Sequence, residues 1–327
     1  MRRRDLLGLT VAGGILPAGC SREGRSRLIR VGVSPFMQSS GFYLANELGY
    51  FADVGLGAKV VYAGSGELVP LLAGGQMDVA MLALTPALVN ALARGARFRL
   101  VAARGQLAPQ CTMTGNLYWR RDFAPPGTEG LRKLRGKRIA LRGGPTVSGF
   151  FLDQVLATVG MTVADVKVVP VGGNEALAAF RNGEVDVLNG GQFLDRDLTE
   201  LAPELIVGFR VSDILPDFQV SHVQYGPTLL DEKHEAGAAF LRAYFRGVRA
   251  FREGATPEFL RTRARDEGMD PSYLDHICRD SISADGVISL EDLRRFIEWS
   301  VAKGYSETPV DPAAAVDTRF LEMGAGG

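Results

Sequence analysis

The side chains best suited to chemistry in this sequence are neutral hydrogen-bonding groups, accompanied by one arginine and one phenylalanine. They fall in six short segments, which are residues 34–41, 63–67, 80–86, 142–149, 171–175 and 188–194. Hydroxyl and amide groups beside an aromatic ring are typical of a pocket that holds a small molecule. The candidate ligand-binding residues are Phe36, Gln38, Ser39, Ser40, Ser65, Thr85, Arg142, Thr146, Ser148, Asn174, Asn189 and Gln192.

Patterns for catalysis or metal binding are weak in the same sequence. Residues 64–67 (Gly-Ser-Gly-Glu) lack the Lys-Ser/Thr ending of a phosphate-binding loop, and we interpret them as a turn into a helix. Residues 281–292 place Asp285 at a calcium-loop position but begin with Ser and end with Asp, so a helix cap at Ser289 fits better. The three histidines lie outside the six segments, and no serine lies in a nucleophile elbow. We therefore expect no catalytic residue, no metal and no cofactor.

The elements that must position the candidate residues occur twice. When the sequence is shifted by 108 residues, segment 30–79 aligns with segment 138–187 without a gap, and 14 of the 50 positions are identical. This composition gives roughly four identities by chance. Positions that both copies keep, such as Asp78 and Asp186, are expected to serve turns and helix ends that both copies need.

Each copy has the same order of elements. A short apolar strand is followed by a loop in which Ser40 or Ser148 is placed as a helix N-cap, then by a helix, a second strand, a glycine loop, a second helix and a third strand. Strands that alternate with helices predict a parallel sheet with right-handed crossovers. The repeat therefore predicts an α/β fold with two lobes.

The remaining segments predict how the two lobes are joined. Residues 101–119 lack helical periodicity and are expected to pass into the second lobe, and residues 205–224 are expected to return. Apolar residues at helical spacing near Tyr244 and Phe296 predict closing helices that pack on the first lobe. We predict an export signal at 1–19, a tether at 20–27, lobe 1 at 28–110 and 220–327, and lobe 2 at 111–219, inserted in lobe 1.

The same architecture predicts where a ligand would bind. Ligands of doubly wound sheets bind outside the carboxyl ends of the strands. The six segments all follow predicted strands, so we expect them to line one cleft between the lobes.

The first twenty residues have the pattern of an export signal. Three arginines precede an apolar stretch, and small residues lead to Cys20. Residues 3–7 (Arg-Arg-Asp-Leu-Leu) resemble a twin-arginine signal, which implies export in the folded state. Residues 18–20 (Ala-Gly-Cys) resemble the end of a bacterial lipobox, with Cys20 as the lipidated residue; cleavage without a lipid is the alternative. For Cys111 and Cys278 we favour two small buried thiols, and a disulfide between them is the alternative.

Composition excludes several classes of protein. The chain has 327 residues, of which 46% are apolar and 23% charged, as in a soluble globular protein with more than one domain. Lys+Arg and Asp+Glu are both 37, so nothing suggests nucleic acid as a partner. No apolar run reaches the ~18 residues of a membrane-spanning helix, and membrane contact is expected through the lipid anchor only.

Several segments resemble the periplasmic solute-binding proteins of ABC importers, specifically the nitrate/sulfonate/taurine group and its pyrimidine-precursor relatives. The similarity runs from about Leu28 to Leu321, and the matching segments are 41–45, 49–51, 134–140, 178–186 and 316–321. The resemblance implies a type II periplasmic binding protein whose two lobes close on a small-molecule ligand in the cleft between them. It also implies a monomer that presents this ligand to the permease and ATPase subunits of an importer.

The resemblance leaves the identity of the solute open. Loop 142–148 lacks the histidine that sulfonate binders often carry, and loop 188–193 is somewhat closer to the pyrimidine-precursor binders. We expect a small organic solute, either a sulfonate, a carboxylate or a pyrimidine-like heterocycle. An enzyme of pyrimidine-precursor metabolism on the same fold, and a lipoprotein that senses a ligand for a signalling receptor, are the alternatives.

Two site hypotheses concern individual residues. Arg142 would bind an acidic group of the ligand if it points into the cleft, and a surface ion pair is the alternative. Ser40 and Ser148 are expected to face each other across the closed cleft, at helix starts where free backbone N–H groups favour an electronegative ligand group. Simple helix capping is the alternative for both serines.

Overall fold

The computed structural model describes residues 27–33, 37–108, 115–142, 145–172, 174–190, 203–266, 268 and 270–325. Phe36, Gln192, Cys20 and the predicted export signal lie outside these ranges, so the predictions made for them are not tested by the structure. Among the described residues, no helix is both long and apolar enough to cross a membrane.

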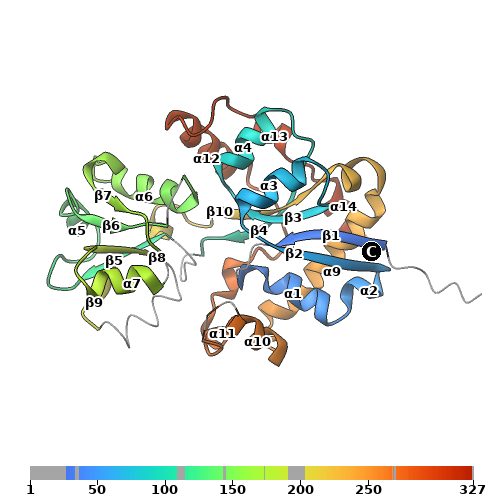
Figure 1. Cartoon of the computed structure of the whole chain (residues 1–327), viewed down its shortest axis with the longest axis horizontal. Coiled ribbons are helices and arrows are strands. Elements are labelled where there is room, and N and C mark those ends of the chain that lie inside the picture. The colour runs from blue at the N-terminus through green and yellow to red at the C-terminus, as the bar shows by residue number, and fades with distance from the viewer. Residues whose placement is uncertain are drawn as a thin grey trace, which may run out of the picture.

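The described strands form two five-stranded sheets that lie side by side (Figure 1). The first sheet has the order β2-β1-β3-β10-β4, and the second has the order β7-β6-β8-β5-β9. The strands of the first sheet are β1 (Arg27–Val33), β2 (Leu56–Tyr62), β3 (Val79–Ala83), β4 (Arg99–Gln106) and β10 (Gln219–Tyr225). Those of the second are β5 (Asn116–Arg120), β6 (Arg138–Ala140), β7 (Lys167–Val169), β8 (Val187–Gly190) and β9 (Leu205–Phe209).

The two sheets confirm the internal repeat. Strands β2, β1 and β3 of the first copy occupy the places that β7, β6 and β8 occupy in the second, and within each trio the strands pair in parallel. The predicted parallel pairing is confirmed for the repeated strands, whereas β10 and β5, which lie outside the repeat, pair antiparallel with their neighbours. Strand β5 is the first strand after the chain leaves the first sheet, and β10 is the strand on which it returns. Each of them runs opposite to the repeated strands of its sheet.

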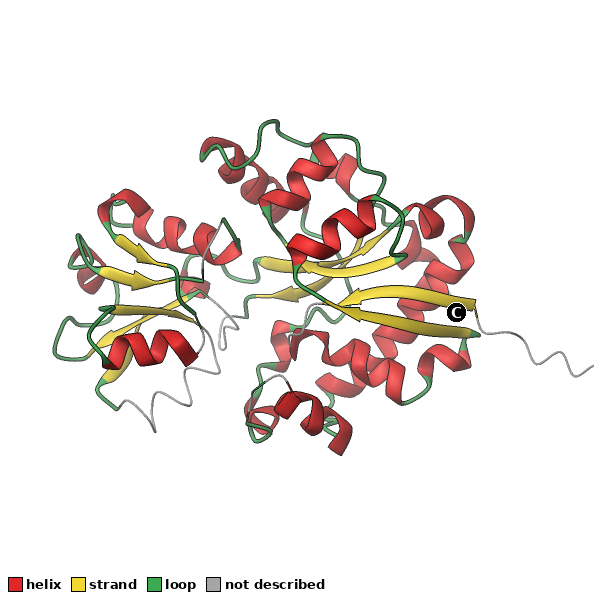
Figure 2. Ribbon diagram, viewed as in Figure 1, coloured by secondary structure: helices red, strands yellow, loops and turns green. Residues whose placement is uncertain are grey.

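Helices cover both faces of each sheet (Figure 2). On one face of the first sheet lie α1 (Ser40–Glu47), α2 (Tyr50–Asp53), α9 (His234–Arg252), α10 (Glu258–Asp266), α11 (Tyr273–His276) and α14 (Arg319–Ala325). On the other lie α3 (Ser65–Ala73), α4 (Pro86–Ala93), α12 (Leu290–Ala302) and α13 (Pro312–Ala315). The second sheet carries α5 (Thr128–Arg132) and α6 (Val147–Ala157) on one face and α7 (Asn174–Arg181) on the other. Short helical turns are η1 (Met37–Ser39), η2 (Val163–Asp165), η3 (Val211–Asp213), η4 (Thr228–Glu232) and η5 (Arg279–Ser281).

Close packing against α9 fixes the position of α1. A Cβ atom at Gly247 would lie 2.0 Å from the carbonyl oxygen of Gly41, and one at Gly41 would lie 2.5 Å from a methyl carbon of Val248. Both glycines are therefore needed for the two helices to approach each other this closely. Because α1 is held in this way, the residues at its start are held beside the end of β1.

The repeated aspartates stabilise the same joint in each lobe. Asp78 accepts hydrogen bonds from the backbone N–H of Arg30 at 2.8 Å and from its Nε and Nη2 atoms at 3.0 and 2.6 Å. Asp186 accepts the same three bonds from Arg138 at 2.8, 3.1 and 2.8 Å. Each pair ties the first strand of a copy to the residue that precedes its third strand. The two aspartates have a structural role, although they join two strands and were predicted to serve turns and helix ends.

Replacing Asp78 by asparagine is expected to lower the free energy of unfolding by about 1.5–3 kcal/mol, the usual range for hydrogen bonds to a charged group. Asp186→Asn is expected to cost less, because the Asp186 side chain is 30% exposed and that of Asp78 only 6%. Urea unfolding of both variants checks this order. Equal losses would show that burial of the ion pair does not determine its contribution.

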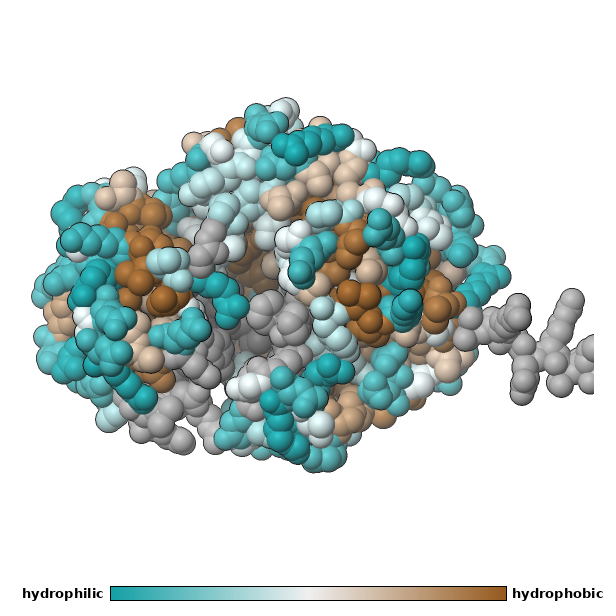
Figure 3. Space-filling model, viewed as in Figure 1, coloured by the Kyte–Doolittle hydropathy of each residue, from teal (hydrophilic) through white to brown (hydrophobic). Residues whose placement is uncertain are grey.

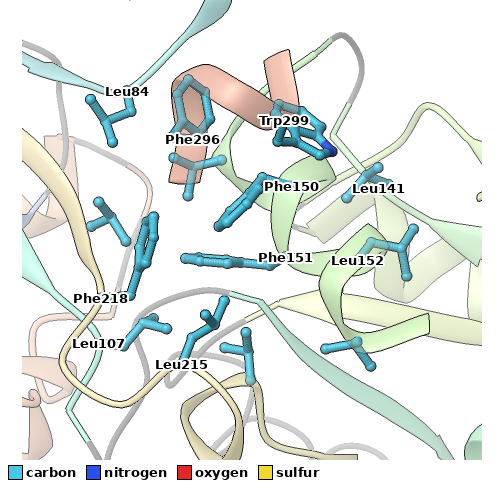
Figure 4. Packing of buried hydrophobic residues seen from close by; sticks show 14 of the residues in the cluster. Leu84, Leu107, Leu141, Phe150, Phe151, Leu152, Leu215, Phe218, Phe296 and Trp299 are labelled. Atoms are coloured by element: carbon cyan, nitrogen blue, oxygen red, sulfur yellow. The ribbon is translucent and has the colours of Figure 1, made fainter. Parts of the chain in front are cut away.

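An aromatic cluster joins the two lobes (Figure 4). Phe150 of α6 packs against Phe218, Phe296 and Trp299, with ring centroids 5.1, 5.8 and 5.5 Å away. Phe296 and Trp299 lie on α12, which was predicted to pack on the first lobe. Helix α12 contacts α4 of that lobe, and it also contacts α6 of the second. It therefore bridges the two lobes.

Hydrogen bonds at the edge of this cluster strengthen the bridge. The Trp299 Nε1–H donates to Asp153 of α6 at 3.1 Å, and the Lys303 ammonium donates to the other oxygen of Asp153 at 2.8 Å. Trp299 lies in α12 and Lys303 directly follows it, whereas the acceptor Asp153 belongs to the second lobe. The lobes thus share a polar contact and a continuous apolar core.

Candidate ligand-binding site

The carboxyl ends of the parallel strands define the candidate site. Strand β1 begins at the end of the molecule farthest from the second sheet and runs toward it (Figure 1). On the face drawn in Figure 3, the surface is hollowed between the lobes. The polar side chains at these strand ends are therefore the ones to compare with the sequence predictions.

In the first lobe, the predicted residues lie at the starts of three helices. Gln38 is half-buried in η1, whereas Ser39 and Ser40 are fully buried. Ser65 is the half-buried first residue of α3. Thr85 is the N-cap of α4, and its hydroxyl accepts the backbone N–H of Leu88 at 3.3 Å. Thr85 thus has a capping bond that accounts for its position.

The predicted N-caps at Ser40 and Ser148 are wrong. Residues 37–39 already form a helical turn, so the N-cap of α1 is Ser39, and Ser40 is its first residue. In the second lobe Thr146 is extended, with φ −135° and ψ 173°, and α6 begins directly after it. Ser148 is therefore the second residue of α6 and is half-buried. The hypothesis that the two serines face each other remains a prediction.

In the second lobe, the predicted residues differ in exposure. Arg142 is exposed just after β6 and lies close to Gly172, where an added Cβ would be 3.3 Å from the Arg142 Nε atom. Asn189 is half-buried in β8. Asn174 is the first residue of α7, and its side chain lies outside the described part of the structure.

Buried polar side-chain atoms without a hydrogen-bond partner occur in both lobes. Among the described residues they belong to Thr146 and Asn189 in the second lobe and, in the first, to Arg104, Ser221, His222 and Tyr244. The atoms are Thr146 Oγ1, Asn189 Nδ2, Arg104 Nε, Ser221 Oγ, both ring nitrogens of His222 and the Tyr244 hydroxyl. Each such atom costs about 1–3 kcal/mol when it stays unpaired. Hydrogen bonds to a bound ligand would remove this cost.

Of the buried groups Arg104, His222 and Tyr244 in the first lobe, Arg104 is the one that is charged at neutral pH. Burial, followed by the nearby Arg104 charge, lowers the pKa of His222 to about 3. Burial raises the pKa of Tyr244 above its usual value, although Arg104 acts in the opposite direction. At neutral pH the imidazole is therefore neutral, the phenol keeps its proton and the guanidinium is cationic. A histidine with this pKa is a poor general base at neutral pH.

Sequence reasoning missed Arg104 and His222. Both lie in segments that we interpreted as passages between the lobes. The signal was present, because Arg104 and Gly105 interrupt an otherwise apolar strand pattern, and an isolated glycine in a strand indicates a bulge or a close approach. His222 likewise lies in a strand that is buried along its whole length.

Two further expectations concern cysteine and metal chemistry. The preference for free buried thiols is wrong for Cys278, which is disulfide-bonded to a residue outside the described part of the chain. A disulfide is typical of an oxidising compartment. Within the described ranges, no three His, Cys, Asp or Glu side chains are grouped so that they could hold a metal ion.

The two α/β lobes have the fold of the periplasmic binding proteins. The family model described as "NMT1/THI5 like" matches residues 37–254, about two thirds of the sequence. The chain belongs to this family. A sequence search of curated proteins gives no match.

Solved structures with the same fold include binding proteins and an enzyme. The aliphatic sulphonate binding protein SsuA from Escherichia coli is 16% identical with a TM-score of 0.71, over 89% of this chain and 92% of that one. The alkanesulfonate-binding protein SsuA from Xanthomonas axonopodis pv. citri, bound to MOPS, is 18% identical with a TM-score of 0.67, over 89% and 98%. The desulfurization enzyme DszB is 14% identical with a TM-score of 0.65, over 92% and 99%. The predicted fold class and family resemblance are confirmed.

Proposed function

We propose that this protein is the solute-binding component of an ABC importer. It would capture a small organic solute, such as a sulfonate, a carboxylate or a pyrimidine-like heterocycle, in the cleft between the lobes and deliver it to a permease. The family membership and the two SsuA structures support a binding role. In this proposal the protein acts as a monomer whose partners are the permease and ATPase subunits.

The observation that carries the proposal is the position of the unpaired polar atoms. Both lobes contribute them, and Arg104 and Asn189 lie near the carboxyl ends of their strands, where ligands of this type of sheet bind. A solute between the lobes would bond to Thr146 and Asn189 on one side and to Arg104 on the other. Such a ligand would stabilise the closed arrangement of the lobes.

The proposed location is the outer face of the cell membrane or the periplasm. Residues 1–19 would direct export, Cys20 would carry the lipid, and residues 20–27 would be the tether to lobe 1 (28–110 and 220–327) and lobe 2 (111–219). The disulfide at Cys278 supports an oxidising compartment. Mass spectrometry of the mature N-terminus from the native host tests both cleavage and lipidation.

The enzyme DszB gives the alternative of catalysis a specific basis, because it shares this fold. The neutral and weakly basic His222 argues against acid–base chemistry at the site of this chain. Sensing for a signalling receptor uses the same ligand site, and a neighbouring gene pair for a permease and an ATPase would favour transport.

A bound solute is expected to raise the free energy of unfolding by about 2.7 kcal/mol when it is present at a hundred times its dissociation constant. Native mass spectrometry of protein from its own host identifies carried ligands, and thermal unfolding with sulfonates, carboxylates and pyrimidines measures the stabilisation. Turnover of the compound that binds would favour an enzyme. Failure of the whole panel, without any carried ligand, would contradict solute binding.

A further inference from the structure

Arg104 occupies an irregular position at the carboxyl end of β4. In the ladder between β4 and β10, His222 pairs with Ala103 and Ser221 pairs with Gly105, so Arg104 has no residue opposite it. This is a β-bulge, an irregularity that redirects a side chain and that recurs beside functional sites. Its side chain is almost completely buried, with 1% of the residue exposed.

The described groups around the Arg104 guanidinium include hydroxyls, and no acid among the described residues pairs with it. Its Nη1 atom donates a hydrogen bond to the Ser39 hydroxyl at 2.8 Å, and its Nε atom has no partner. Among the described residues, no carboxylate forms an ion pair with it. Burial lowers the pKa of Arg104, and the nearby phenols of Tyr244 and Tyr43 act in the opposite direction.

A buried cation without a counter-ion is unfavourable. Transfer of a charged group into the protein interior costs several kcal/mol unless a partner of opposite charge and good hydrogen bonds offset it. Twelve arginines form ion pairs among the described residues, and all of them lie nearer the surface than Arg104, with side chains at least 27% exposed. Arg104 is thus unlike them in both burial and pairing.

We propose that Arg104 is the ligand's counter-ion, so that the solute carries a carboxylate or sulfonate group that binds to this guanidinium in the first lobe. This assignment rests on the proposed function and narrows its ligand to an anion. The planar guanidinium suits an anion with two acceptor oxygens. Ser39 orients it, and the ligand supplies the acceptor that Nε lacks. Neutral His222 and the Tyr244 hydroxyl add hydrogen bonds without adding charge.

The proposal replaces the sequence hypothesis for Arg142 with a residue in the other lobe. Arg142 is exposed, so water competes for its guanidinium and screens its charge. Arg104 is buried, so an anion that reaches it interacts in a medium of low dielectric constant. Arg142 is therefore a suitable control for the effect of removing one arginine.

The test compares Arg104→Met with Arg142→Met and wild type. Titration calorimetry uses four probes at constant ionic strength: sulfate, MOPS as an organic sulfonate, benzoate as a carboxylate and uracil as a neutral heterocycle. Arg104→Met should bind the anionic probe about 10- to 100-fold more weakly, which is the range of a charge-assisted hydrogen bond. Arg142→Met should bind it as wild type does, and Arg104→Lys should retain part of the affinity.

Unfolding without any probe gives a second readout. Since methionine removes an uncompensated buried charge, Arg104→Met should unfold at the same temperature as wild type or at a higher one. A clear drop in this temperature, with anion affinity unchanged, would show that Arg104 is structural and overturn the proposal. If uracil alone binds, and binds equally to wild type and Arg104→Met, solute binding stands and the anion assignment falls. If no probe binds and no ligand is carried from the host, both fall.

Discussion

Replacing Phe150 by alanine is expected to lower the free energy of unfolding by about 3–5 kcal/mol and to separate the unfolding of the two lobes. Phe150 is 1% exposed and contacts rings from the returning segment (Phe218) and from α12 (Phe296 and Trp299). Its removal opens a cavity where the two lobes meet. The lobes would then lose the shared core that makes them unfold together.

Tryptophan fluorescence can follow this separation, because the chain has only two tryptophans. Trp119 lies in the core of the second lobe, and Trp299 lies in the cluster between the lobes. In a Trp119→Phe background, Trp299 fluorescence should change at lower urea than the circular dichroism signal when Phe150 is alanine. Phe180→Ala is the matched control, since Phe180 packs within the second lobe only. Coincident transitions in the Phe150 variant would refute the shared-core explanation.

Because of His222, the free energy of unfolding is expected to decrease as the pH is lowered from about 6.5 to about 3. The folded protein holds the imidazole neutral, mainly through burial, and its pKa is about 3. The unfolded chain takes up the proton near pH 6.5 and so binds more protons than the folded state in this window. Stability therefore rises with pH there, by up to about 1.4 kcal/mol per pH unit, and the contribution of His222 is fully present above pH 6.5.

Urea unfolding between pH 7 and pH 4.5 checks the pH dependence. His222→Asn should remove most of the histidine-dependent slope, whatever its effect on stability at pH 7. His276→Asn is the control, because His276 lies on the exposed end of α11. The comparison of slopes separates His222 from the carboxylates, which also contribute to acid unfolding in all three proteins. An unchanged slope in His222→Asn would mean that the imidazole is not held neutral.

The repeat made the fold predictable, because equivalent residues form equivalent contacts in both copies. Asp78 and Asp186 bind arginines at equivalent positions, and the three repeated strands take equivalent places in the two sheets. The positions of β5 and β10 were not predictable in this way. Their antiparallel pairing depends on contacts between segments that are far apart in the sequence.

The candidate site was less predictable than the fold, because it too depends on contacts between segments that are far apart in the sequence. Loop residues such as Thr146 were found because they follow repeated strands. Arg104 and His222 lie inside non-repeated strands, and a ladder irregularity that no local pattern specifies brings them together. Helix starts were also missed by one or two residues at Ser40 and Ser148, since the turn before a helix is set by its packing.

The place of β10 in the first sheet also determines the order in which the two lobes can fold during synthesis. In the described structure the ladder partner of β4 is β10, which is made roughly a hundred residues later, and the isolated bridges of β4 to Ile282 and Val316 form with segments made later still. At ~5–20 residues per second, that gap lasts about 5–20 seconds. All five strands of the second sheet are made within it, so the lobe that is inserted in the sequence can finish first. Until β10 is made, β3 and β4 each lack a neighbouring strand, and such open edges can pair with other chains.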